Sequence, residues 1–304
     1  MKETDLLRRH FTLLPGTLIA GRLRLDGAGA LKVHDVVERI QTSLGGEWPP
    51  SAPDGFKAGD PMTPVKGIAA TAMATLGVLK QASKAGTNLV ITYEPTFFGR
   101  HDSPAPVATG TNGRGLFGVA AEDPVYQAKK EFIEKNGLVV FRLRDHWQAR
   151  KENDMATGLA ESLGWTKYRV APDDVLYDIP GATAEDTVVL IRKKLNLRGG
   201  LRAVGDCKAR VRRVMLHPGV MTPATMWQRY AETDLVVTGE VREWENTHYA
   251  ADIYTAGEKR GLVTIGRVAS EDPGMRVCAT WLKTLAPEIP ARWIPTGDLY
   301  WRAA

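Results

Sequence analysis

Residues 65–94 read VKGIAATAMATLGVLKQASKAGTNLVITYE, and this stretch decides the fold class. It begins with a mostly apolar run at 65–71, continues with apolar residues at helical spacing over 73–85, and ends with the wholly apolar run at 89–91. A short apolar run without a polar face is typical of a strand that is buried on both sides in a parallel sheet. The order strand, helix, strand therefore predicts an α/β protein.

The alternation of strands and helices continues on both sides of this stretch. Apolar residues at helical spacing predict helices at 33–44, 126–136, 155–163, 183–195, 226–231, 248–260 and 274–285. Short apolar runs predict strands at 137–141, 212–216, 235–237 and 262–265. Residues 46–64 and 99–118 are rich in turn-forming residues, so we expect loops there, the second acting as a lid or arm.

These elements predict an α/β fold of two packed halves, with mixed or parallel sheets and a cleft between them. The halves are expected at roughly 33–125 with 210–304, and at 126–209. Because ligands of parallel α/β sheets sit at the carboxyl ends of the strands, polar residues at those ends are candidates for a shared site. Such residues occur at Tyr93-Glu94, Asp145-His146, Glu240 and Arg267 to Glu271.

The composition excludes several classes of protein. Of the 304 residues, 43% are hydrophobic and 25% are charged, which is typical of a globular chain. The net charge of +5 is spread along the chain without a basic stripe, so we expect no nucleic-acid partner, whereas a small anionic ligand fits this balance. No run approaches the ~20 apolar residues that span a membrane, so no membrane partner is expected. Cys207 and Cys278 have no paired spacing and predict small buried side chains only.

Residues 1–32 stand apart from the α/β pattern. Arg8-Arg9-His10-Phe11, followed by a short apolar stretch, is typical of a twin-arginine export leader. Pro15 and the charges at Arg22 and Arg24 are atypical of such a leader and fit a basic arm on a cytoplasmic protein. The sequence is compatible with both localisations.

Five segments, in order along the chain, carry a resemblance to a known family. They read GDPMTPVKGIAATAMATLGVLKQASKAGTNLVITYEPTFF at 59–98, LGW at 163–165, RAVGD at 202–206, DLVVTGE at 234–240 and IGRVASEDPGM at 265–275. The chain resembles the Nif-three-like dinuclear metal centre hexameric family, many of whose members carry the name GTP cyclohydrolase 1 type 2, and within it a branch with twin-arginine leaders. The resemblance implies a homo-hexamer and a site where two divalent ions, Zn, Fe or Mn, activate water for hydrolysis.

Most of the histidines that bind metal in that family are replaced in this chain. The family's Thr-His-Glu-Pro or Thr-His-His-Pro pair falls on Tyr93 and Glu94. The His and Glu of its Gly-His-x-x-Ser-Glu motif fall on Arg267 and Glu271. A guanidinium is always protonated and cannot donate a lone pair to a metal, so we expect a weakened or altered metal site.

A further ligand segment follows the strand at 137–141. It reads RDHWQ at 144–148, with Arg144 and Gln148 where the resemblance places ligands. The resemblance implies metal ligation, if it is retained, by Glu94, Gln148 and Glu271, and catalysis by Glu94, Glu271 and Tyr93. Arg144, His146 and Arg267 are expected to contact a cofactor or ligand.

Two functions follow from these residues. The first is a divergent dinuclear-metal hydrolase or cyclohydrolase-like enzyme of unknown substrate, with Glu94 and Glu271 at an altered site. The alternative is a metal-free oligomeric scaffold or a binder of a small anionic ligand, in which arginine–glutamate pairs close the pocket. Ring hydrolysis of GTP is only a family label and has no independent support in these residues.

Overall fold

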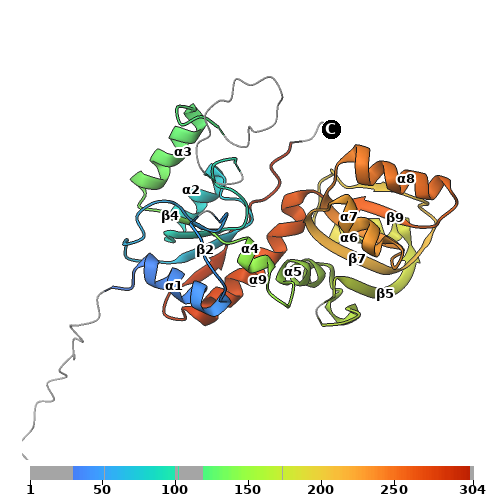
Figure 1. The fold of residues 1–304 in the computed structure, drawn as a ribbon, viewed down its shortest axis with the longest axis horizontal. Coiled ribbons are helices and arrows are strands. Elements are labelled where there is room, and N and C mark those ends of the chain that lie inside the picture. The colour runs from blue at the N-terminus through green and yellow to red at the C-terminus, as the bar shows by residue number, and fades with distance from the viewer. Residues whose placement is uncertain (1–29, 51, 100–101, 103–118, 173, 302–304) are drawn as a thin grey trace, which may run out of the picture. The chain divides into compact units, whose positions relative to one another are not determined.

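The computed structural model describes residues 30–50, 52–99, 102, 119–172 and 174–301. Residues Leu31–Ala304 form one compact unit, whose ribbon is drawn in Figure 1. The predicted Arg8-Arg9 leader lies outside the described residues, and so does the predicted lid or arm at 99–118 apart from residues 99 and 102. The predicted α/β class is confirmed, because two five-stranded sheets are each covered by helices.

The first sheet has the strand order β1-β4-β3-β2-β10, in which β1 is antiparallel to β4 and the other neighbours are parallel. The bounds are β1 Gly55–Ala58, β2 Ile68–Thr71, β3 Leu89–Thr92, β4 Val139–Arg142 and β10 Ala291–Trp293. Helix α1 (Val33–Leu44) covers one face, and helices α2 (Leu76–Lys84) and α3 (Pro124–Lys135) cover the other. Every residue of β2, β3 and β4 is buried for this reason.

The second sheet has the order β5-β7-β8-β9-β6, with parallel central strands and an antiparallel strand at each edge. Its strands are β5 Leu176–Thr183, β6 Arg202–Val204, β7 Arg210–Val220, β8 Leu235–Glu240 and β9 Gly261–Thr264. Helices α5 (Asp154–Leu163) and α6 (Ala184–Lys194) pack on one face, and α7 (Pro223–Tyr230) and α8 (His248–Thr255) on the other. A π-helical turn at Glu243–Thr247 precedes α8, and a short helix α4 (Asp145–Gln148) follows β4.

Helix α9 (Arg267–Leu285) joins the two sheets. It follows β9 of the second sheet, contacts β7 and β8 there, and packs against β2 and β10 of the first. Figure 1 shows it running between the sheets beside α5. The crossing with α5 requires glycine, because a Cβ on Gly158 would lie 2.2 Å from the Pro273 carbonyl oxygen and one on Gly274 would lie 2.4 Å from Met155 Sδ. The N-terminus of α9 is thereby held where residues of both sheets can reach it.

Several sequence predictions differ from the structure. Strand β1 lies within the predicted loop at 46–64, and the edge strands β5, β6 and β10 were not predicted. Helix α9 begins at Arg267 rather than at residue 274, because it continues through Pro273. The sheets also do not follow the predicted halves: β4 joins the first sheet, and the strands between 210 and 264 join β5 and β6 in the second.

The environment of the two cysteines also differs from the prediction. Cys278 is buried in α9 as expected, but Cys207 is exposed, so the prediction of two buried thiols was wrong for Cys207. It lies in the turn between β6 and β7, outside any packed face. None of the described helices is long and apolar enough to cross a membrane.

Candidate functional site

The end of β3 fixes the position of Tyr93 and Glu94. Their backbone N–H groups donate to the carbonyls of Thr71 and Ala72 at 3.1 and 2.8 Å, so the chain stays paired with the end of β2 for two residues beyond the strand. The Thr92 hydroxyl also donates to the Glu94 carbonyl at 3.0 Å. Only 9% of the Glu94 side chain is exposed. The first sheet therefore presents one buried carboxylate at its carboxyl edge.

The second sheet contributes its side chains through the end of β8 and the start of α9. Gly266 has a φ of 92° and donates to the Gly239 carbonyl at 2.9 Å, which turns the chain from β9 into the helix. Gly239 leaves no room for a side chain, since a Cβ there would lie 2.5 Å from both the Gly219 carbonyl oxygen and Ser270 Oγ. Glu240, the next residue, ends β8 and forms an ion pair with Arg267 in the first turn of α9.

Arg267 brings the polar residues of both sheets together. Its Nη2 lies 2.5 Å from Glu94 Oε1, its Nη1 lies 2.8 Å from Glu240 Oε1, and its Nε lies 3.3 Å from Glu271 Oε1. A single guanidinium thus contacts carboxylates that come from β3, β8 and α9. Together with Arg144, these residues make up what we call the strand-end cluster: Glu94, Arg144, Glu240, Arg267 and Glu271.

Arg144 reaches the same carboxylate from the first sheet. Its Nε donates to Glu94 Oε1 at 3.3 Å, and its Nη1 lies 3.6 Å from Asp145 Oδ1. Its guanidinium carbon lies 5.3 Å from the centroid of the Tyr93 ring, within range of a cation–π contact. Glu94 is therefore held between two arginines, and both keep part of the side chain exposed, 28% for Arg144 and 22% for Arg267.

Glu271 is the most deeply buried member of the cluster, with 1% of its side chain exposed. Among the described residues, neither of its carboxylate oxygens has a hydrogen-bond partner. Burial, and then the nearby charge of Glu94, raise the pKa of Glu271 well above its usual range, although Arg267 and Arg144 oppose this shift. Gly219 closes over it, since a Cβ there would lie 2.7 Å from Glu271 Oε1.

Tyr93 and Gln148 lie beside the cluster and contact each other. The Tyr93 hydroxyl donates to Gln148 Oε1 at 3.3 Å. Burial raises the pKa of Tyr93 above its ordinary value, so the phenol stays protonated at physiological pH. A protonated phenol is a poor metal ligand, and the Gln148 oxygen is already an acceptor for it. These contacts favour a structural hydrogen bond over the ligand role expected for Gln148.

The His146 ring contacts residues outside the cluster. Its ring stacks on Trp48 at 3.4 Å between centroids, Nδ1 lies 2.8 Å from Asp54 Oδ2, and Nε2 lies 3.0 Å from the Glu47 carbonyl oxygen. Asp54 also accepts the backbone N–H groups of Arg144, Asp145 and His146, which caps α4. The expectation that His146 contacts a ligand beside Glu94 thus has no support in its contacts. Asp54 was not predicted, because nothing in its Pro- and Gly-rich surroundings marks it.

The cluster does not offer the donors that a dinuclear centre needs. Each of its carboxylates faces a guanidinium, and no imidazole joins them among the described residues. In the described part of the chain, three or more His, Cys, Asp or Glu side chains converge within 4.8 Å at one place, the group His34, Asp35 and Glu38. Two divalent ions usually require several imidazoles and carboxylates free to coordinate. The strand-end residues therefore do not fit the metal pair that the resemblance implies.

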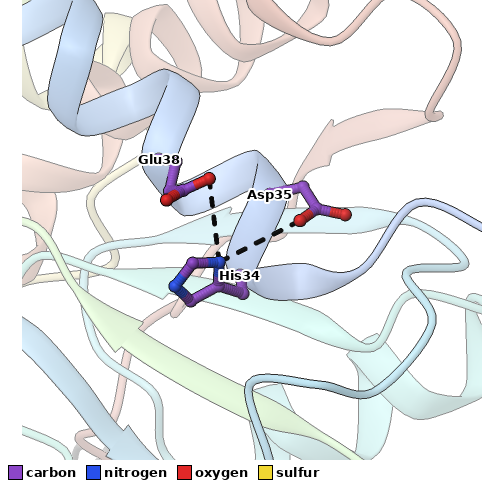
Figure 2. A group of neighbouring side chains, drawn as sticks. All are labelled: His34, Asp35 and Glu38. Carbon is purple, nitrogen blue, oxygen red and sulfur yellow. Dashed lines mark ion pairs between the residues drawn. The ribbon is translucent and has the colours of Figure 1, made fainter.

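The converging group His34, Asp35 and Glu38 lies on α1, as Figure 2 shows. His34 Nδ1 lies 4.0 Å from Asp35 Oδ1 and 3.8 Å from Glu38 Oε2. The side chains are 46%, 43% and 62% exposed, and Asp35 also accepts the backbone N–H of Lys32 at 2.8 Å. This is the ordinary charged surface of an amphipathic helix, and nothing in it indicates a ligand.

Comparison with solved structures identifies the fold. The Staphylococcus aureus protein SA1388 matches 91% of this chain over 100% of its own, with a TM-score of 0.66 and 15% identity. A Bacillus cereus protein related to NIF3 matches 90% of this chain over 100% of its own, with a TM-score of 0.64 and 13% identity. This chain has the NIF3 fold. A third structure with this fold, protein ybgI of unknown function, matches 88% of this chain over 99% of its own, with a TM-score of 0.63 and 17% identity.

The NIF3 fold agrees with the sequence resemblance, but identities of 13–17% fix the architecture and not the chemistry. No protein-family model and no curated protein matches the sequence. The function must therefore be argued from the strand-end cluster itself.

Proposed function

We propose that this chain is a divergent member of the Nif-three-like family that works without the dinuclear metal centre, as a metal-free oligomeric scaffold. In this proposal the strand-end cluster holds the two sheets together instead of activating water. The observation that carries the proposal is the position of Arg267, whose guanidinium contacts carboxylates from β3, β8 and α9 at 2.5 to 3.3 Å.

Electrostatics supports a metal-free cluster. Two like unit charges ~5 Å apart repel by about 3 kcal/mol at an effective dielectric of about 20. Arg144 and Arg267 both lie against Glu94, so a divalent ion bound to that carboxylate would face two repulsions, each about twice as large because the ion carries two charges. Neither arginine can lose its proton to relieve them. Metal affinity should therefore be lower by orders of magnitude than that of a site built from neutral imidazoles.

A role in assembly agrees with the aromatic surface of the second sheet's helices. Trp227 is 55% exposed, Trp244 is 71% exposed and Tyr249 is 37% exposed, and the rings of Trp227 and Tyr249 lie 5.8 Å apart. Large aromatic side chains grouped on a surface are typical of protein interfaces. The homo-hexamer that the resemblance implies would bury such residues, and light scattering on the purified protein measures the subunit number.

One observation favours a second candidate, the binding of a small anion. Arg144 and Arg267 keep 28% and 22% of their side chains exposed at the carboxyl edge of the strands, where ligands of α/β sheets sit. Glu240, which pairs with Arg267, is 49% exposed and is the partner most easily displaced. A phosphate or carboxylate group could then take its place in a bidentate contact. Calorimetric titration with pyrophosphate, with R276Q as the matched arginine control, tests this candidate.

The metal-free proposal is tested by thermal unfolding with and without Zn²⁺ or Mn²⁺. A site with a Kd near 1 μM would stabilise the protein by about 2.7 kcal/mol at 100 μM metal. We expect no rise in the melting temperature of the wild-type protein at that concentration. The E94Q/E271Q double variant separates the possible sources of a rise, because it removes the two carboxylates that match the family's ligands.

A rise that disappears in E94Q/E271Q would contradict the proposal and restore the hypothesis of a metal-dependent hydrolase. A rise that persists in E94Q/E271Q and disappears in H34A would come from the surface of α1 and leave the proposal intact.

A further inference from the structure

The buried carboxylate of Glu271 lacks the contacts that usually stabilise such a group. Its side chain is 1% exposed, and neither oxygen has a hydrogen-bond partner among the described residues. The nearest cation is the Arg267 guanidinium, whose Nε lies 3.3 Å from Oε1. A buried carboxyl group without hydrogen-bond donors either binds a proton or is balanced by a neighbouring positive charge, and Arg267 opposes the protonation of Glu271. Glu271 therefore relies on Arg267 in a way that an exposed glutamate would not.

The spacing of the carboxylates around Arg267 matches the size of a guanidinium. Each of its three nitrogens lies near a different carboxylate: Nη2 near Glu94, Nη1 near Glu240 and Nε near Glu271. These carboxylates do not form a group whose oxygens all lie within 4.8 Å of one another in the described part of the chain. A single metal ion needs its ligand oxygens about 3 Å apart, since each lies ~2.0–2.2 Å from the ion. The three carboxylates together therefore fit a wider, planar cation, and the two that lie within hydrogen-bond reach of each other are Glu94 and Glu271.

Arg276, on the same helix, shows that this arrangement is not a general feature of α9. Its Nη2 lies 3.2 Å from Glu161, both side chains are more than 40% exposed, at 42% and 44%, and the pair stays within the α5–α9 surface. Exposed pairs of this kind contribute little to stability. Arg276 is therefore a matched control for the charge, side-chain size and helical context of Arg267.

We propose that the Arg267 side chain is a built-in substitute for a bound cation, and that its removal uncovers a binding site for a free guanidinium-type cation between Glu94, Glu240 and Glu271. This inference rests on the proposed metal-free function. In the wild-type protein the guanidinium belongs to the Arg267 side chain and already occupies the site, so a free cation is not expected to bind there. In R267A the carboxylates remain, of which Glu94 and Glu271 are buried, and only Arg144 is left to balance them.

The experiment is chemical rescue of R267A by methylguanidinium. R267A should melt roughly 5 °C or more below the wild-type protein, because Glu94 then keeps only Arg144 as an ion-pair partner and Glu271 loses its contact with Arg267. Addition of methylguanidinium at about 5–20 mM should recover at least half of that loss in R267A and change the wild-type protein and R276A little. Equal concentrations of sodium and tetramethylammonium chloride control for ionic strength. The same loss in R276A, or the same response of all three proteins to methylguanidinium, would overturn the proposal.

Adding Zn²⁺ or Mn²⁺ to R267A in place of methylguanidinium tests the size of the site. R267A should respond to methylguanidinium at concentrations where these metals give a smaller rise in melting temperature. If the metals rescue R267A better than methylguanidinium does, the site is metal-shaped and the proposal is wrong, while the metal-free function of the wild-type protein still stands. If the wild-type protein itself binds metal at Glu94 and Glu271, the proposed function fails instead.

A double variant keeps the proposal testable if R267A is not recovered in soluble form. R267A/E271Q replaces the buried carboxyl group by a neutral amide of similar shape, which removes the cost of ionising or protonating Glu271 without Arg267, so it should be soluble and more stable than R267A. It should also respond less to methylguanidinium, because one of the three carboxylates is gone. A double variant that is insoluble, or that responds as strongly as R267A, would contradict the role assigned to Glu271.

Discussion

The strand-end cluster and the exposed group on α1 contain similar carboxylates but have opposite properties. The α1 group of His34, Asp35 and Glu38 has metal-type donors within reach of one another, yet its side chains are 43–62% exposed. The strand-end cluster has the burial and the position of a functional site, yet guanidinium groups occupy the space between its carboxylates. The difference shows that donor chemistry and location must coincide before a metal site can be inferred.

The largest expected effect is a difference in the free energy of unfolding between a variant of the strand-end cluster and a variant of the α1 group. E94A removes the carboxylate that lies between Arg144 and Arg267, and breaking a buried ion pair in this way costs about 3–5 kcal/mol. E38A removes an exposed carboxylate of α1 and should change the free energy of unfolding by less than about 0.5 kcal/mol. Urea denaturation of both variants measures this contrast. Similar losses in E94A and E38A would mean that the cluster does not hold the sheets together.

A second prediction concerns the pH dependence of stability. The folded protein raises the pKa of Glu271 above its usual value, so it binds that proton more tightly than the unfolded chain does. The wild-type protein should therefore lose stability as the pH rises above the ordinary pKa of a glutamate, and a Gln at this position cannot contribute to that loss. The free energy of unfolding of E271Q relative to wild type should increase between pH 5 and pH 8. A difference that is equal at both pH values would show that Glu271 is ionised in the folded protein throughout.

The smallest of the three effects tests whether His146 is structural. H146A loses the stacking on Trp48 and the contact with Asp54, which should cost about 1–2 kcal/mol. Ligand and metal responses of the protein should not change, because the ring contacts Trp48, Asp54 and Glu47 rather than the cluster. A variant with wild-type stability but an altered response to pyrophosphate would place His146 in a binding site after all.

Much of the fold could be predicted from the sequence because its central strands are short apolar runs between helices. The runs at 89–91, 235–237 and 262–265 are strands in the structure, each buried by helices on both sides. The edge strands escaped prediction for a physical reason. Strand β1 is half-buried at every position and so lacks an apolar pattern, and β5 contains Pro180 and Gly181, which are typical of loops.

The candidate site could be predicted only in part. The sequence predicted that Glu94, Arg267 and Glu271 would share a site because each follows a strand, whereas the structure brings them together from two different sheets, with Arg267 and Glu271 on α9. The direction of His146 depends on Asp54, 92 residues away, and no local pattern carries that information. Likewise, the burial of Glu271 depends on Gly219, whose missing Cβ allows the close contact.

Elemental analysis of the wild-type protein, purified without metal-affinity steps or chelators, tests the central claim most directly. The account predicts far less than one equivalent of Zn, Fe or Mn per subunit, because Arg267 and Arg144 already neutralise the carboxylates at the strand ends. About two equivalents per subunit, lost in the E94Q/E271Q variant, would contradict it.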